Sequence, residues 1–164
     1  MKYFAYGSNM SVLRLKQRVP SAKKIGVVTL NNHQLRFNMS GNDGSGKCDC
    51  FVTNNVNDYV IGVLFDIDDK EKTILDVAED LGTGYFDKTV AVVDNEGKVY
   101  EAFIYCALKI DNTLKPYSWY IYHVIFGATQ ANISSNYIAN IESVKSIKDV
   151  NKVREYRELA IYNN

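Results

Sequence analysis

Short segments that alternate apolar and polar residues fill the first two-thirds of the chain, a pattern typical of strands with one buried face. The alternation predicts strands over residues 2–6, 48–53 and 59–66, and one or two more within 24–38. Two further alternating runs, 85–93 and 99–108, flank the turn sequence Asp-Asn-Glu-Gly at 94–97 and predict a hairpin. We expect these strands to form a mostly antiparallel or mixed sheet.

Helical periodicity replaces the alternation after Pro116. Apolar residues recur at helical spacing over 119–130, 136–147 and 150–161. Strands first and helices last indicate an α+β protein whose helices pack around the sheet, rather than a doubly wound α/β fold. The sequence contains no internal repeat and no linker, so we expect residues 1–164 to form a single domain.

A short helix is also predicted near the N-terminus, over residues 10–18. Asn9 or Ser11 would cap its first turn. Met10, Leu13 and Gln17 would lie on one face of this helix.

A second short helix is expected over residues 70–79, after the capping pair Asp68-Asp69. Gly82 and Gly84 would end it. Three residues at helical spacing would form its buried face, namely Ile74, Leu75 and Ala78.

Composition and charge exclude several classes of function. The 164 residues are 46% hydrophobic and 23% charged, as in folded globular proteins, and 19 basic residues balance 19 acidic ones. The densest basic run, residues 14–18, has its charges at helical spacing and is expected to form a solvated face. Because no basic patch or stripe stands out, we expect neither a nucleic acid nor a membrane surface as partner.

The N-terminal residues and the cysteines predict a cytoplasmic location. The N-terminus has no apolar run followed by a cleavage site, and no window approaches the ~20 apolar residues that span a bilayer. Three cysteines, Cys48, Cys50 and Cys106, are an odd number and too few for a disulfide framework. We therefore expect reduced, buried thiols.

Residues 41–48, Gly-Asn-Asp-Gly-Ser-Gly-Lys-Cys, come close to a phosphate-binding P-loop. The final position should be Ser or Thr, whose hydroxyl reaches magnesium, but it is Cys48. A helix should follow to present its N-terminus to phosphate, but a strand is predicted. We expect a hairpin loop that binds no nucleotide.

Metal binding has equally weak support. Cys48 and Cys50 would share one face of a strand, but the other candidate ligands lack the spacing of a zinc site, namely Cys106, His33 and His123. His123 lies in an aromatic helix, where a packed imidazole is expected. We predict no metal site.

Two segments carry stronger signals. Residues 3–10, Tyr-Phe-Ala-Tyr-Gly-Ser-Asn-Met, place a glycine-opened turn between an aromatic strand and a helix. Backbone N–H groups in such a turn can hold a carboxylate or an oxyanion. The alternative is an ordinary strand–turn–helix connection.

The second segment, residues 75–85, places Glu79 in the last turn of a helix. The negative end of the helix dipole disfavours the charged carboxylate there, and partial burial would do the same. Both effects favour a group that takes up and returns a proton near neutral pH. The alternative is a surface residue before a glycine stop.

Together these segments resemble the γ-glutamylcyclotransferase-like family, which includes γ-glutamylamine cyclotransferases and AIG2-like proteins. Tyr6-Gly-Ser-Asn9 is similar to the family's Tyr-Gly-Ser-Asn signature, and Leu75-Asp-x-x-Glu79 followed by Gly84-Tyr85 is similar to the segment with its catalytic glutamate. The resemblance covers residues 2–147, with further similarities at Arg18-Val-Pro-Ser-Ala, 60–65, Trp119-Tyr120 and Gly127-Ala128. Two departures are Asp80, where the family commonly has Gly, and a poor match over 48–55.

The resemblance implies a small mixed β-barrel or β-roll with peripheral helices. It also implies a transferase- or lyase-type enzyme that needs neither cofactor nor metal and cyclises a γ-glutamyl group to 5-oxoproline. Glu79 would be the general acid–base residue. The turn at residues 7–9 and Glu79 would then share one pocket.

The resemblance also implies the residues that bind the substrate. Gly7, Ser8 and Asn9 would hold its α-carboxylate or the oxyanion. Pocket walls would be formed by Tyr6, Tyr85 and Tyr120. The sequence leaves open the oligomeric state and whether an amino acid, an amine or a larger conjugate is released. The alternatives are a non-catalytic small-molecule-binding protein of the same fold and a nucleotide-dependent enzyme.

Overall fold

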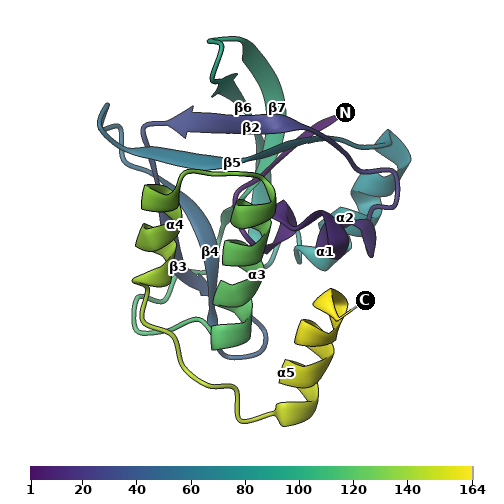
Figure 1. Cartoon of the computed structure of the whole chain (residues 1–164), viewed down its shortest axis with the longest axis vertical. Helices are drawn as coiled ribbons and strands as arrows, with labels where there is room; N and C mark the ends of the chain where they lie inside the picture. The colour runs from purple at the N-terminus through teal and green to yellow at the C-terminus, as the bar shows by residue number, and fades with distance from the viewer. Residues whose placement is uncertain (164) are drawn as a thin grey trace.

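The computed structural model describes residues 1–163; Asn164, the last residue of the predicted domain, lies outside the described residues. Five strands close into a barrel in the order β1-β5-β2-β6-β7 (Figure 1). These strands are β1 Lys2–Ala5, β2 Lys23–Asn31, β5 Tyr59–Asp66, β6 Tyr85–Asp94 and β7 Val99–Ala107. Neighbours pair antiparallel except β1 and β7, which pair parallel and close the barrel. The predicted mixed barrel is confirmed.

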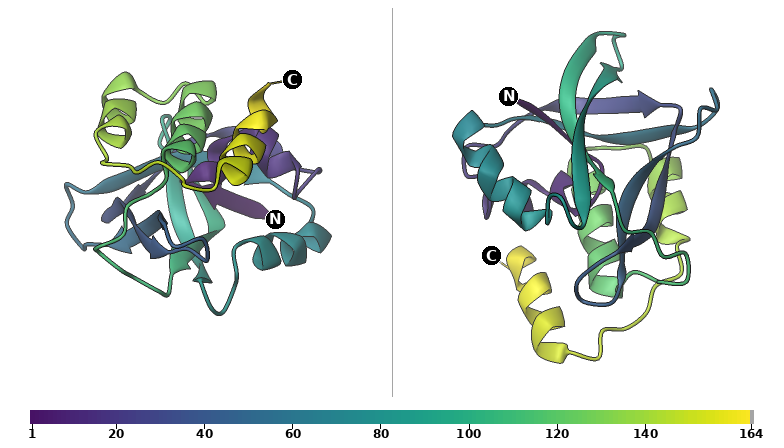
Figure 2. Two further views of the ribbon diagram at one scale, coloured as in Figure 1. Left: turned by 90° about the horizontal axis from the view of Figure 1, so that it is seen from below. Right: turned by 180° about the vertical axis from the view of Figure 1, so that it is seen from behind.

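Two remaining strands form a separate ribbon that extends from the barrel (Figure 2). They are β3 His33–Ser40 and β4 Gly46–Val52. The region predicted to hold one or two strands therefore holds two, β2 and β3. Because β4 begins at Gly46, the P-loop-like segment runs directly into a strand, as its sequence indicated.

Helices α3 Ser118–Gln130, α4 Ser135–Glu142 and α5 Lys152–Leu159 lie on one side of the strands (Figure 2, left). The α4 helix ends earlier than predicted. Ile147 leaves helical geometry because its N–H donates to the Pro116 carbonyl at 3.0 Å and its own carbonyl accepts from Ser118 at 2.9 Å. Within residues 1–163, no helix is both long and apolar enough to cross a membrane.

The N-terminal helix α1, Val12–Lys16, is shorter than predicted and presents a different face. Ser11 caps it, with its hydroxyl accepting from the Arg14 N–H at 3.4 Å. Of the three residues expected on one face, Met10 is buried, whereas Leu13 and Gln17 are exposed. The expected solvated basic face is also wrong, because Arg14 is buried and ion-paired to Glu158 of α5 at 2.6 Å. Packing by α5 thus decides which side of this single turn faces inward.

Helix α2, Lys72–Ala78, follows a 3-10 turn at Asp69–Glu71 that Asp68 caps. Its predicted buried face is correct only at Leu75, which has no exposed surface. Ile74 and Ala78 are exposed. A helix of about two turns at the end of the barrel contacts it along one line, so residues to either side of that line stay in solvent.

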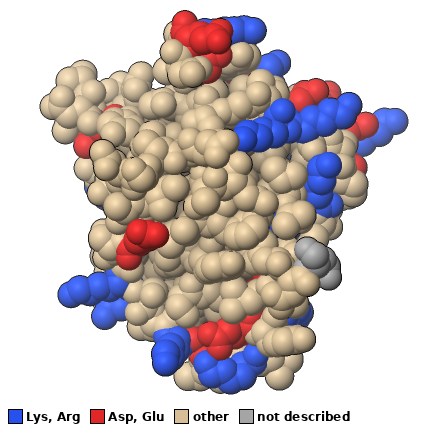
Figure 3. Space-filling model, viewed as in Figure 1, with Lys and Arg blue, Asp and Glu red and all other residues tan. Residues whose placement is uncertain are grey.

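The largest fully buried side chains hold the strands, α1 and α2 around one core, and include Phe4, Leu15, Leu64, Phe65, Leu75 and Ile104. Charged residues on the face shown in Figure 3 lie mostly at its margins, basic next to acidic. No continuous basic patch forms on that face.

Close packing between α3 and the N-terminal turn depends on Gly127. A Cβ there would overlap the backbone nitrogen of Ser11 and lie 2.7 Å from the carbonyl carbon of Met10. Glycine therefore allows α3 to press against the segment that follows β1, and so fixes the position of residues 7–11.

Gly127→Ala should destabilise the protein by about 1–3 kcal/mol, the usual effect of overpacking. Helix propensity alone predicts the opposite sign, since Ala is favoured over Gly by about 1 kcal/mol in a helix interior. Urea unfolding measures the difference. Gly26→Ala is the control, because a Cβ on that glycine meets nothing within 4 Å. A Gly127→Ala protein as stable as wild type would contradict the packing argument.

Candidate active site

The turn after β1 lies against β4. A Cβ on Gly7 would lie 3.0 Å from the Cys48 Cβ, so glycine permits this approach. The chain then enters a 3-10 turn at Ser8–Met10, whose first N–H groups have no partner inside the turn. Among residues 1–163, no backbone acceptor receives the N–H of Gly7, Ser8 or Asn9. These donors are available to an anion.

Asn9 joins this turn to Glu79. Its side chain is 4% exposed, and its Nδ2 donates to Glu79 Oε1 at 2.8 Å and to the Tyr3 hydroxyl at 3.1 Å. Arg18 Nη1 donates to Asn9 Oδ1 at 2.8 Å. Because a guanidinium can only donate, it fixes the amide so that Nδ2 faces the carboxylate. The predicted meeting of the two motifs in one pocket is confirmed.

Glu79 is placed by the way α2 ends. The Leu81 N–H donates to the Asp76 carbonyl at 2.9 Å, and the Asp80 N–H donates to the Val77 carbonyl at 3.2 Å. This pattern is a Schellman motif, and Asp80 takes its left-handed position with φ of +52°. Asp80 thus stands at a backbone position where glycine is favoured. Glu79 Oε2 has no hydrogen-bond partner among residues 1–163 and is free for a substrate.

An inner compartment brings all the predicted site residues together. Its lining includes Glu79 with the six predicted substrate-binding residues Tyr6, Gly7, Ser8, Asn9, Tyr85 and Tyr120. The lining also includes three residues that were not predicted from the sequence, namely Tyr3, Cys48 and Tyr105. Tyr105 reaches the pocket because β7 pairs with β1, and Cys48 reaches it because β4 packs against Gly7, which local sequence does not reveal.

The tyrosine hydroxyls differ in what they can offer a ligand. Tyr6 donates to the Tyr105 carbonyl at 2.6 Å, and Tyr85 donates to the Cys48 carbonyl at 2.8 Å, so both protons are engaged. Tyr120 instead accepts from the Cys48 N–H at 3.0 Å and keeps its own proton free. Burial raises the pKa of all three hydroxyls well above the ordinary value. Of the three predicted tyrosines, Tyr120 is therefore the neutral donor that can point into the pocket.

An outer compartment of about 140 Å³ adjoins the inner one through Ser8, Glu79, Tyr85 and Tyr120. It adds three cationic residues that the sequence analysis did not assign to the site, namely Arg14, Arg18 and Lys47. The sequence feature that could have indicated these cations is the spacing of Arg14 and Arg18, which lie four residues apart soon after the Gly-Ser-Asn turn.

Lys47, the lysine of the P-loop-like segment, is held within its own loop. Its Nζ donates to Asp43 Oδ2 at 2.6 Å and to Ser45 Oγ at 2.7 Å. It also lies 4.7 Å from the ring centres of Trp119 and Tyr120. No helix follows this loop, so it lacks the dipole of a phosphate site. The absence of nucleotide binding stays a prediction.

Similarity to known proteins agrees with this geometry. A model of the AIG2-like family matches residues 59–141, about half of the chain, and the match includes Glu79, Tyr85 and Tyr120. The chain belongs to the AIG2-like family. Comparison with curated proteins yields no match.

Solved structures share the fold of this AIG2-like protein. A gamma-glutamyl cyclotransferase superposes with a TM-score of 0.89 at 24% identity, covering 100% of this chain and 99% of its own. An uncharacterized protein from Homo sapiens gives 0.86 at 26% identity, with 98% and 96% covered. A yeast γ-glutamyl cyclotransferase specific to glutathione gives 0.57 at 10% identity, with 86% and 95% covered. The barrel, the ribbon and the helices are thus a recurrent arrangement.

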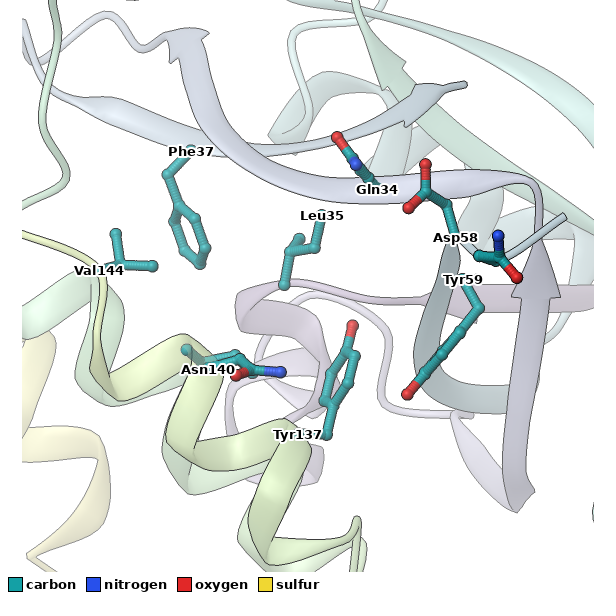
Figure 4. Close-up of a pocket in the computed structure, with 10 residues that line it drawn as sticks. Gln34, Leu35, Phe37, Asp58, Tyr59, Tyr137, Asn140 and Val144 are labelled. Carbon is teal, nitrogen blue, oxygen red and sulfur yellow. The ribbon is translucent and has the colours of Figure 1, made fainter. Parts of the chain in front are cut away.

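A different hollow lies between β3 and α4 in the AIG2-like protein (Figure 4). Its volume is about 270 Å³, and it shares no lining residue with the two compartments described above. Leu35, Phe37 and Tyr137 form much of its wall, and Asp58 is its single charged lining residue. None of the predicted site residues lies there, so the candidate active site is the pocket around Glu79.

His123 is buried, as predicted, and it also bonds to polar partners. Its Nε2 lies 3.2 Å from Arg14 Nη1, and its Nδ1 lies 2.7 Å from the Tyr162 hydroxyl. Burial, together with the nearby Arg14 charge, lowers the pKa of His123 to about 4. The imidazole is therefore neutral near pH 7 and links α1 and α3 to the C-terminal segment.

The three thiols should be inert in the native protein. All are buried, and burial raises the pKa of Cys48 to about 12, that of Cys106 to about 11, and that of Cys50 well above the ordinary value. We expect almost no reaction of the folded protein with Ellman's reagent at pH 8, since the thiolate is the reactive form. After unfolding in guanidinium, all three should react. Rapid native labelling of Cys48 would contradict its burial.

Proposed function

We propose that this protein is a cofactor-independent γ-glutamyl cyclotransferase that converts a γ-glutamyl compound to 5-oxoproline and a free amine. The hydrogen bond from Asn9 to Glu79 carries the proposal, because it places unpaired backbone donors and a carboxylate around the same space. The proposal includes a small-molecule substrate and a cytoplasmic location.

In this reaction the substrate supplies its own nucleophile. The α-amine attacks the γ-carbonyl, a five-membered lactam closes, and the C–N bond to the leaving amine breaks. At neutral pH the α-amine is an ammonium and must first lose a proton. Glu79 takes that proton through Oε2 and returns it to the leaving nitrogen, as one carboxylate can serve both transfers. The attacking nitrogen loses a second proton as the lactam forms, and the released amine takes up this proton from water and leaves as an ammonium.

The remaining groups have positioning and electrostatic roles. Asn9 holds the Glu79 carboxylate through Oε1 and leaves Oε2 directed at the substrate. The N–H groups of Gly7, Ser8 and Asn9 bind the substrate α-carboxylate or the oxyanion that forms at the γ-carbon. The Tyr120 hydroxyl supplies a neutral donor. Holding amine and carbonyl in reach of each other contributes further, since the attack is intramolecular.

A panel of γ-glutamyl compounds tests the reaction. Purified protein is incubated with γ-glutamyl amino acids, γ-glutamylamines and γ-glutamyl peptides, and 5-oxoproline is followed by mass spectrometry. Release of 5-oxoproline from at least one class supports the proposal. Binding of these compounds without any turnover would indicate a non-catalytic protein of the same fold.

Glu79→Gln should lower turnover by at least about a hundredfold, the usual contribution of a general acid–base residue. The amide keeps the size of the side chain and can still accept from Asn9, but it cannot take up a proton. Melting temperature should change by no more than about 4 °C. Substrate binding, measured by calorimetry, should persist because the backbone donors are unchanged.

Neighbouring carboxylates on the same helix end provide the controls. Asp76→Asn and Asp80→Asn should have much smaller effects on turnover than Glu79→Gln. Asp76 is engaged by Lys72 and by the Tyr105 hydroxyl, so a modest loss of stability is expected there. If Asp80→Asn is inactive and Glu79→Gln is active, the acid–base residue is Asp80 and the proposed role of Glu79 is wrong.

A further inference from the structure

Three cationic side chains line the outer compartment, and two of them already have carboxylate partners. Arg14 Nη1 lies 2.6 Å from Glu158 Oε2 of α5. Lys47 Nζ lies 2.6 Å from Asp43 Oδ2. In each pair the carboxylate neutralises the cation, and the N–H donor that binds this carboxylate is not free for a ligand.

Arg18 differs from both. Among residues 1–163 it forms no ion pair, and its one hydrogen bond to a side chain runs from Nη1 to Asn9 Oδ1. It is partly buried, and desolvation, reinforced by the Arg14 charge, lowers the pKa of its guanidinium. A cation withdrawn from water without a partner is unfavourable, and an incoming anion relieves that penalty. A guanidinium with free N–H groups also matches a carboxylate geometrically.

We propose that Arg18 determines specificity by binding the carboxylate of the leaving group, so that the substrate is a γ-glutamyl amino acid or peptide rather than a γ-glutamylamine. This inference rests on the proposed cyclotransferase activity. The end of the glutamyl part enters the inner compartment, which has a volume of about 30 Å³ and no Lys or Arg in its lining, and the leaving group extends past Glu79 into the outer one. Arg18 lines that second space.

Two carboxylates share the outer lining and define the competing specificity. Glu79 is the proposed base, and Asp80 accepts from Asn42 at 3.3 Å at the exposed rim. If these groups dominated, the compartment would favour a cationic leaving group such as a diamine. Arg18 dominates over Asp80 in our proposal because its guanidinium is desolvated, whereas water and salt screen the Asp80 charge at the exposed rim.

A matched set of substrates separates these possibilities. γ-Glutamyl-alanine and γ-glutamyl-ethylamide differ only by the carboxylate of the leaving group. A third compound, the γ-glutamyl amide of ethylenediamine, carries an ammonium instead. Wild-type protein should prefer γ-glutamyl-alanine over γ-glutamyl-ethylamide in kcat/KM by about tenfold to a hundredfold, as expected of a charge-assisted hydrogen bond. A preference for the diamine derivative would assign specificity to Asp80 and overturn the proposal.

Arg18→Gln should reduce that preference to about one. Loss of the Asn9 contact would slow both substrates equally, so only the ratio between them reports carboxylate binding. Lys16→Gln removes an exposed charge from the end of α1, two residues before Arg18, and should keep the wild-type ratio. Arg18→Lys is a second variant for the case in which Arg18→Gln folds poorly. It keeps the positive charge but loses the planar pair of N–H donors, so it should give an intermediate ratio. An unchanged ratio in the Arg18 variants would overturn the proposal.

Failure of the proposed reaction can be distinguished from failure of this inference. If wild type releases no 5-oxoproline from any compound, the cyclotransferase proposal fails. Calorimetric binding of γ-glutamyl-alanine and γ-glutamyl-ethylamide to wild type and Arg18→Gln then still reports on the carboxylate contact. Equal affinities of wild type for the two compounds would exclude it.

Discussion

The buried amide of Asn9 is the contact on which the site depends. It joins a turn near the N-terminus to a helix end 70 residues later, and it donates to Glu79 at 2.8 Å. Arg18 fixes the orientation of this amide, because its Nη1 donates to Asn9 Oδ1 at 2.8 Å. A single side chain thus sets the distance between the unpaired backbone donors and the carboxylate. The barrel makes this meeting possible, because β1 and β7 pair parallel and β6 begins beside the end of β7, at Tyr85 opposite Ala107. The turn after β1 and the segment before β6 therefore lie at the same end.

Packing against the turn holds Asn9 in place. Gly127 lets α3 approach the backbone of Met10 and Ser11, and Gly7 lets the turn approach Cys48 of β4. Both glycines serve close approach rather than a left-handed backbone, and neither has positive φ. The aromatic residues of β1 and β7 fill the space beneath, with Tyr3 stacked on Phe103 at 5.0 Å between ring centres. The site is therefore supported from three sides by elements distant in sequence.

Electrostatics divides the pocket into two parts. The inner part has buried tyrosines and a carboxylate, which suit proton transfer and hydrogen bonding to a small substrate. The outer part has cations, and the α5 helix changes its balance by supplying Glu158 to Arg14. Of the two arginines that line this compartment, that pairing leaves Arg18 as the one without a carboxylate partner among residues 1–163. A helix outside the matched family segment thereby affects what the pocket can bind.

Local sequence determined much of this protein. Alternation and turn residues predicted the strands and the hairpin, because these features follow from side-chain period and backbone preference. The Gly-Ser-Asn turn and the carboxylate before a glycine stop indicated two candidate site segments, the Gly7–Asn9 turn and Glu79. Only the tertiary structure decided which faces of the short helices are buried: Arg14 turned inward, and Ile74 turned outward. A helix of one or two turns has too few residues for its periodicity to specify a face, so packing of distant segments decides it.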